Sequence, residues 1–143
     1  MTTPIQPGVS NTPKGRLLVL DDDAAIGQLL LIVAQRAGFE ARLCGHAAEF
    51  FEALQHWSPT HLAIDLTMPD MPGLEVMQHV AAQGSRAWVI ISSGAGAAEI
   101  ESALQYARAL GLRTAGALPK PFSLSSMREL LARSGDDCCA PGA

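Results

Sequence analysis

The sequence predicts an α/β domain built on a doubly wound parallel sheet, and three observations support this prediction. Short apolar runs alternate with amphipathic stretches along the chain. Three of the runs are almost continuously apolar, which is typical of strands covered on both faces. The stretches that separate the runs carry apolar residues at helical spacing, so five strand–helix units fit into about 120 residues.

Five segments are predicted strands because they are short, apolar and bounded by turn residues. They are Arg16–Leu20, Ala41–Cys44, His61–Ile64, Trp88–Ser92 and Gly116–Leu118. Five amphipathic stripes predict helices whose apolar faces pack on the sheet. Gly38 and Gly111 are placed to end the first and fourth helices, and Ser123 is placed to cap the fifth. The stripes begin at Ile26, Ala47, Leu74, Ile100 and Leu124.

Composition limits the classes of function and the extent of the domain. The 143 residues carry a net charge of −4 and no Lys/Arg cluster, so we expect no direct nucleic-acid contact. No apolar run approaches the roughly 20 residues of a membrane span, and we expect a cytoplasmic protein without membrane contact.

Proline and glycine are frequent in residues 1–15, which predicts a disordered leader. Residues 135–143 predict a flexible tail, which leaves one folded domain over residues 16–134.

Polar side chains stand where the predicted strands end. Asp21–Asp23 follow the first strand, and Asp65 follows the third. Ser93 follows the fourth strand, and Lys120 follows the fifth. Because right-handed crossovers bring the carboxyl ends of parallel strands to one edge, we expect these side chains to converge. Carboxylates within about 4–5 Å repel one another, and Mg²⁺ suits such an all-oxygen donor set better than zinc or copper.

This predicted cluster is suited to phosphoryl transfer. The cation would hold two oxygens of a phosphoryl group, Ser93 would donate to a third, and Lys120 would neutralise the remaining charge. Asp65, at the centre, would act as the nucleophile and become an aspartyl phosphate. Taken singly, the acids are ordinary helix-cap residues, the serine is a turn hydroxyl and the lysine is a solvated side chain. Their conjunction at the ends of four strands favours a functional site.

Four segments of the chain resemble the receiver domain of two-component response regulators. In chain order they are RLLVLDDD, LAIDLTMPDMPGLEVM, VIISSGAG and GALPKPF, and the resemblance runs from about Arg16 to Arg133. It implies a flavodoxin-like, five-stranded parallel sheet of order 2-1-3-4-5 with five helices. It also implies a cis peptide bond between Lys120 and Pro121, which an X–Pro bond allows.

The resemblance also implies roles for the strand-end residues. Asp65 would take phosphate from the phosphohistidine of a sensor histidine kinase or phosphotransfer protein, while Ser93 and Lys120 contact the phosphoryl group. Such a domain catalyses only its own phosphorylation and dephosphorylation, and it switches a partner or effector. The residues implied to hold Mg²⁺ are Asp21 through water, Asp22, Asp65 and the backbone carbonyl of Thr67.

Two further features concern the output of the domain. Many receivers carry Tyr or Phe three residues before the lysine, but Ala117 stands here, so we expect signalling through the Ser93–Gly96 loop and the fourth helix. The resemblance places output, and a homodimer contact, on the fourth helix, fifth strand and fifth helix, including Tyr106. The stretch ALGLRTAGALPKPF also resembles receivers joined to EAL-type cyclic-di-GMP phosphodiesterase domains, which makes such a domain a candidate effector.

Two other functions stay open from the sequence. A haloacid-dehalogenase-type phosphatase also uses a strand-end Asp-x-Asp, a hydroxyl and a lysine, with Asp21 as nucleophile and Asp23 as acid and base. Against this reading, Ala24–Ala25 replaces the hydroxylated or β-branched pair of that family, and Asp65 is left unexplained. A degenerate receiver that acts only as a binding module is the other alternative.

Overall fold

The computed structural model describes residues 14–139, in which strands and helices alternate. The strands are β1 (Gly15–Leu20), β2 (Phe39–Cys44), β3 (His61–Asp65), β4 (Trp88–Ser93) and β5 (Arg113–Pro119). The helices are α1 (Ala24–Arg36), α2 (Ala47–His56), α3 (Gly73–Ala82), α4 (Ala97–Ala109) and α5 (Leu124–Cys139). The predicted alternation of five strands and five helices is therefore confirmed.

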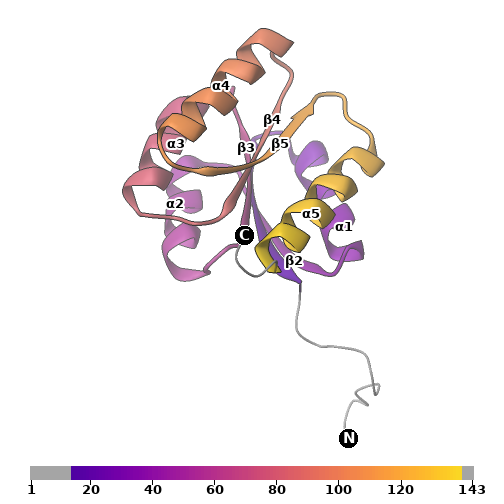
Figure 1. Ribbon diagram of the computed structural model, residues 1–143. Helices are drawn as coiled ribbons and strands as arrows, with labels where there is room; N and C mark the ends of the chain where they lie inside the picture. The colour runs from indigo at the N-terminus through magenta and orange to yellow at the C-terminus, as the bar shows by residue number, and fades with distance from the viewer. Residues whose placement is uncertain (1–13, 140–143) are drawn as a thin grey trace, which may run out of the picture.

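The strands form one parallel sheet in the order β2-β1-β3-β4-β5. This order is the flavodoxin-like arrangement implied by the resemblance. Helices α1 and α5 cover one face of the sheet, and α2, α3 and α4 cover the other (Figure 1). Because every strand runs in the same direction, all carboxyl ends lie at one edge, and the loops that follow them meet there.

Two apolar layers hold the helices to the sheet. On one face, Phe50 of α2 and Met77 of α3 belong, with Ile91 of β4, to one buried apolar cluster. On the other face, Leu30 of α1 and Met127 of α5 belong to a second buried cluster. All five residues of β3 are buried, as expected for a central strand covered on both sides. These layers fix the positions of the strand ends where the polar residues stand.

Both edge strands are longer than the sequence predicted. In β2 only the end residues Phe39 and Cys44 are buried, and in β5 only Leu118 is buried, so neither edge strand has a continuous buried run. The folded part also begins before residue 16, the first residue of the predicted domain. Gly15 belongs to β1, and the amide of Lys14 donates to the carbonyl of Gly38 at 2.9 Å. Residues 1–13 of the predicted leader lie outside the described residues.

The last helix overlaps the predicted tail. The helix α5 continues to Cys139, although residues 135–139 were predicted to be flexible. Gly135 weakens a helix by only about 1 kcal/mol relative to alanine, and the first proline beyond it is Pro141. Residues 140–143 of the predicted tail lie outside the described residues.

Three residues have contacts or exposures that the sequence did not predict. Leu74 and Leu124, which begin two apolar stripes, are each 45% exposed because they stand in the first turn of a helix, beyond the sheet edge. Tyr106, expected on the output face, accepts a hydrogen bond from the side chain of Gln78 on α3. This hydroxyl therefore faces α3. No helix in residues 14–139 combines the length and the apolar character of a membrane span.

Candidate functional site

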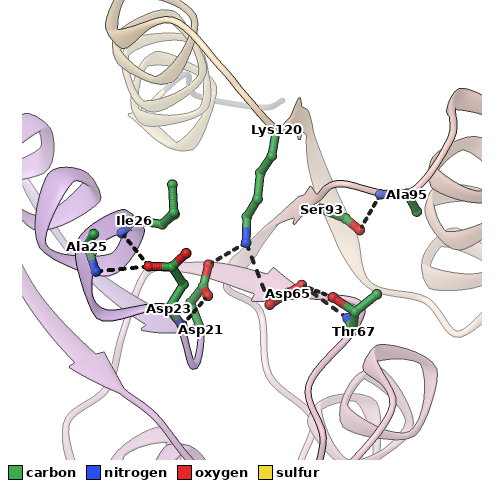
Figure 2. Close-up of polar contacts among 9 residues, drawn as sticks. All are labelled: Asp21, Asp23, Ala25, Ile26, Asp65, Thr67, Ser93, Ala95 and Lys120. Carbon is green, nitrogen blue, oxygen red and sulfur yellow. Dashed lines mark hydrogen bonds and ion pairs between the residues drawn. The ribbon is translucent and has the colours of Figure 1, made fainter.

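Residues from three separated strands meet at the carboxyl edge of the sheet (Figure 2). Asp21 follows β1, Asp65 ends β3, and Lys120 follows β5. The Lys120 ammonium nitrogen lies 2.8 Å from Asp21 Oδ2 and 3.6 Å from Asp65 Oδ2. The two carboxylates are almost fully buried, and the lysine side chain is 19% exposed. The structure thus brings together three of the residues that the sequence predicted to converge.

The local fold holds each of these three side chains. The Asp21 amide donates to the carbonyl of Cys44, and Asp21 Oδ1 accepts from the amide of Asp23 at 2.9 Å. The Lys120 amide donates to the carbonyl of Ser93 at 2.8 Å, which ties the start of the last loop to β4. The Lys120–Pro121 peptide bond is cis, as the resemblance implied. These contacts fix the bases of the side chains and leave their polar ends turned toward the site.

Asp65 is oriented by its own turn. Both the amide and the hydroxyl of Thr67 donate to Asp65 Oδ1, each at 3.0 Å. The family resemblance implies a role for the Thr67 carbonyl, and the contact from the Thr67 hydroxyl is an addition from the structure. Because Oδ1 is held by Thr67, the second oxygen of Asp65 is the one that faces Lys120.

The turn after Asp65 needs a glycine at its far end. The amide of Gly73 donates to the carbonyl of Leu66, which closes the loop at 3.2 Å. A Cβ at position 73 would lie 2.8 Å from the backbone Cα of Leu66, closer than real contacts allow. Within the loop, Asp70 Oδ2 accepts from the amide of Ala47 at 2.8 Å and so ties the loop to the start of α2. Asp70 was not among the predicted site residues, and its place after Met-Pro, ahead of a turn, was the available signal.

The site also offers a set of metal ligands. Carboxylate oxygens of Asp21, Asp22 and Asp65 lie within 4.8 Å of one another, two from buried residues and one from an exposed residue. Asp23 is turned away, because its carboxylate caps α1 by accepting from the amides of Ala25 and Ile26. Hard oxygen donors with one open side suit Mg²⁺, which keeps several of its waters. The donor set therefore fits the cation that the sequence predicted.

Burial and charge oppose each other at the ion pair. Burial raises the pKa of Asp21 above its ordinary value, although its hydrogen bonds to Lys120 and Asp23 act in the opposite direction. Burial alone would lower the pKa of Lys120, but the hydrogen bond to Asp21 and the nearby acids raise it. Lys120 therefore stays charged at neutral pH, and it balances part of the negative charge at the site.

Ser93 lies near this cluster but is bonded elsewhere. Its hydroxyl accepts from the amide of Ala95 at 3.0 Å, within its own loop (Figure 2). The residue is fully buried, and no hydrogen bond joins its hydroxyl to Asp65 or Lys120 in the described structure. The sequence predicted its place at the end of β4 correctly. The direction of the hydroxyl depends on the loop conformation, which a sequence pattern does not define.

The comparison with known families decides what kind of domain this is. The family model of the response regulator receiver domain matches residues 17–132. The chain belongs to this family. The site described above thus lies at the carboxyl edge of a receiver sheet, and the receiver fold expected from the four sequence segments is confirmed.

Curated relatives of this receiver domain are longer proteins. The transcriptional regulatory protein FixJ of Bradyrhizobium diazoefficiens is 32% identical over 128 residues, which cover 87% of this chain and 60% of FixJ. The DNA-binding response regulator MtrA of Mycobacterium tuberculosis is 29% identical, over 58% of this chain and 36% of MtrA. The chain therefore spans 60% or less of the length of these relatives. They lend no support to the expected EAL-type effector or to the expected absence of nucleic-acid contact.

Solved structures agree with the receiver fold. A response regulator from Colwellia psychrerythraea is 28% identical, with a TM-score of 0.71 over 85% of this chain and 97% of that one. The signal receiver domain of a putative LuxO repressor from Vibrio parahaemolyticus has a TM-score of 0.75 at 17% identity, over 86% and 91% of the two chains. At that lower identity the likeness concerns the fold alone.

Proposed function

We propose that Asp65 accepts a phosphoryl group from the phosphohistidine of a sensor histidine kinase or a phosphotransfer protein. The observation that carries this proposal is the gathering of Lys120 and two further carboxylates around Asp65 in a receiver fold. A carboxylate oxygen of Asp65 attacks phosphorus, the P–N bond breaks, and the histidine nitrogen leaves with the electron pair. One phosphoryl group thereby moves from nitrogen to oxygen.

The acids of the site are proposed to hold Mg²⁺. When bound, this cation supplies the positive charge that lets clustered carboxylates accept an anionic group. The clustering of three carboxylates within 4.8 Å supports this assignment. The proposed ligands are Asp22, Asp65, the backbone carbonyl of Thr67 and, through water, Asp21.

Lys120 and Ser93 are proposed to contact the phosphoryl group. Lys120 already lies between the carboxylates of Asp21 and Asp65, so a short movement brings its ammonium to a phosphoryl oxygen. Ser93 stands one residue before the exposed Gly94, and its hydroxyl would exchange its contact with Ala95 for one with phosphate. Phosphorylation would then favour conformers in which both groups reach Asp65.

The proposed output surface is formed by α4, β5 and α5. It is connected to the site because Lys120 follows β5 and its amide donates to Ser93, the last residue of β4 before the loop that leads to α4. Movement at Ser93 or Lys120 is thereby passed to both elements. The proposed binding partner of this surface is a second copy of the domain or an effector. In the cytoplasm, the domain would act as a switch whose chemistry is limited to its own phosphorylation and dephosphorylation.

The experiment incubates the chain with Mg²⁺ and acetyl phosphate, or with a phosphorylated kinase, and measures intact mass. We expect one added phosphoryl group that Asp65→Asn abolishes and that Asp21→Asn only weakens. Repeated turnover of a phosphomonoester that requires Asp21 would instead support the haloacid-dehalogenase-type alternative. A folded wild-type chain that takes no label under any of these conditions would support the degenerate binding module.

A further inference from the structure

One buried hydroxyl next to the proposed phosphoacceptor has no hydrogen-bond partner. Among the described side chains, Ser92 Oγ and Trp88 Nε1 are the buried polar atoms without a partner. Both residues lie on β4, at opposite ends of the strand. Ser92 is 1% exposed, so water does not replace the missing partner easily. An unpartnered buried hydroxyl lowers the stability of the fold, because no hydrogen bond compensates for its removal from water.

The register of the sheet places Ser92 beside Asp65. Ser92 pairs with Asp65 on β3 and with Leu118 on β5. Register partners on neighbouring parallel strands point to the same face, and the strands lie about 4.8 Å apart. Ile90, two residues earlier on the same face, and Leu118 are both fully buried apolar residues. Asp65 is therefore the polar side chain among these neighbours that can accept a hydrogen bond from Ser92.

In the unphosphorylated site the Asp65 carboxylate is engaged elsewhere. Its Oδ1 accepts two hydrogen bonds from Thr67, and its Oδ2 faces the ammonium of Lys120. A phosphoryl group on Asp65 would change both conditions. It adds three acceptor oxygens and further negative charge, which attract the lysine away from the carboxyl group. A hydroxyl rotates freely about its C–O bond, so Ser92 can donate to whichever oxygen comes within reach.

We propose that Ser92 is a second hydroxyl of the phosphorylation site, unpartnered in the resting domain and donating to an oxygen of phosphorylated Asp65. This inference rests on the proposed function of Asp65. It adds a residue to which the sequence gave no chemical role: Ser92 ends the predicted fourth strand, and the phosphoryl contact was assigned to Ser93. The hydroxyl would destabilise the resting state and stabilise the phosphorylated one, and so it would bias the domain toward phosphorylation.

The test compares resting stability with affinity for a phosphoryl mimic. Beryllofluoride with Mg²⁺ is titrated into wild type and Ser92→Ala, and unfolding of the same proteins by urea is followed by circular dichroism. We expect Ser92→Ala to bind beryllofluoride roughly three- to tenfold more weakly, the loss of one hydrogen bond. Its resting stability should stay equal or rise, because an unpartnered group has been removed. Ser92→Cys, similar in volume and a weak donor, should also bind more weakly.

Trp88→Phe is the matched control, since it removes the other unpartnered donor of β4 at the far end from Asp65. Its beryllofluoride affinity should equal that of the wild type. Equal affinity of Ser92→Ala and wild type would overturn the inference while leaving the role of Asp65 intact. A clear loss of resting stability in Ser92→Ala would also overturn it, because the hydroxyl would then have a partner in the resting fold. If wild type neither binds beryllofluoride nor takes a phosphoryl label that Asp65→Asn removes, the proposed function itself fails.

Discussion

Lys120 is paired more closely with Asp21 than with Asp65. Its ammonium nitrogen lies 2.8 Å from Asp21 Oδ2 and 3.6 Å from Asp65 Oδ2, although Asp65 is the proposed phosphoacceptor. The lysine thus neutralises part of the charge of the resting site and leaves one side of Asp65 less tightly held. This arrangement gives the lysine a part in the stability of the unphosphorylated domain, in addition to its proposed contact with the phosphoryl group.

Lys120→Met should destabilise the domain by about 3 kcal/mol at pH 7, because it leaves two buried carboxylates without their cation. Urea unfolding measures this change. The variant should regain part of its stability when Mg²⁺ is added. It should also regain stability as the pH falls. Burial raises the pKa of Asp21, so the folded domain binds a proton there more tightly than the unfolded chain does. Lys120→Arg, which keeps the charge, should lose much less, and equal stability of Lys120→Met and wild type would contradict the pairing.

Two neighbouring acids should respond differently to alanine substitution. Asp22→Ala should abolish or strongly weaken Mg²⁺ binding with little change in the stability of the metal-free domain, because Asp22 is exposed and near the other two acids. Asp23→Ala should keep Mg²⁺ binding but lose about 1 kcal/mol of stability, because it removes the cap of α1. Calorimetric titration with Mg²⁺ and urea unfolding measure the two effects. If both variants bound Mg²⁺ equally, the assignment of Asp22 would be wrong.

His61 should make the domain less stable in mild acid. The residue is buried in β3 beside Phe39, and burial, followed by the charge of Arg113, lowers its pKa to about 4. In the unfolded chain the pKa of this histidine is near its ordinary value of 6.5, so the unfolded chain binds a proton there more readily than the folded domain does. Stability is therefore lost as the pH falls from 6.5 toward 4, by about 2.5 kcal/mol at pH 4.5.

Urea unfolding of wild type and His61→Gln at pH 7 and at pH 4.5 isolates this contribution from that of the acids. The drop in stability between the two pH values should be smaller in the variant by about 2.5 kcal/mol. His56→Gln is the control, because that histidine is exposed. Equal drops in His61→Gln and wild type would show that protonation of His61 is not linked to unfolding.

Gly73→Ala should damage both the fold and the site. A Cβ at this position would press on the backbone of Leu66, next to Asp65, and backbone cannot move aside cheaply. We expect a loss of about 2 kcal/mol in urea unfolding and slower labelling of Asp65 by acetyl phosphate. Gly45→Ala is the matched control, since nothing lies within 4 Å of a Cβ there. A Gly73→Ala protein with wild-type stability and labelling would show that the turn adapts.

Much of the site could be predicted because strand ends are a local property of the sequence. Short apolar runs followed by acids, a serine and a lysine are visible in the chain, and parallel topology requires such ends to meet. The contacts of Asp70 and Gly73 were harder to predict. Asp70 contacts the start of α2, 23 residues earlier in the chain, and Gly73 is limited by the backbone of Leu66. Neither contact leaves a periodic pattern in the sequence.

The order of apolar runs, helical stripes and strand-end polar residues determined the class of fold, the edge where the site lies and the side chains that meet there. Only the tertiary structure decided which acid the lysine prefers, that Ser93 is turned toward Ala95, and that Ser92 is buried without a partner. The physical reason is distance along the chain. Periodicity reports neighbours within a few residues, whereas Lys120 and Asp21 are 99 residues apart, and their contact depends on how the packed helices set the strand ends.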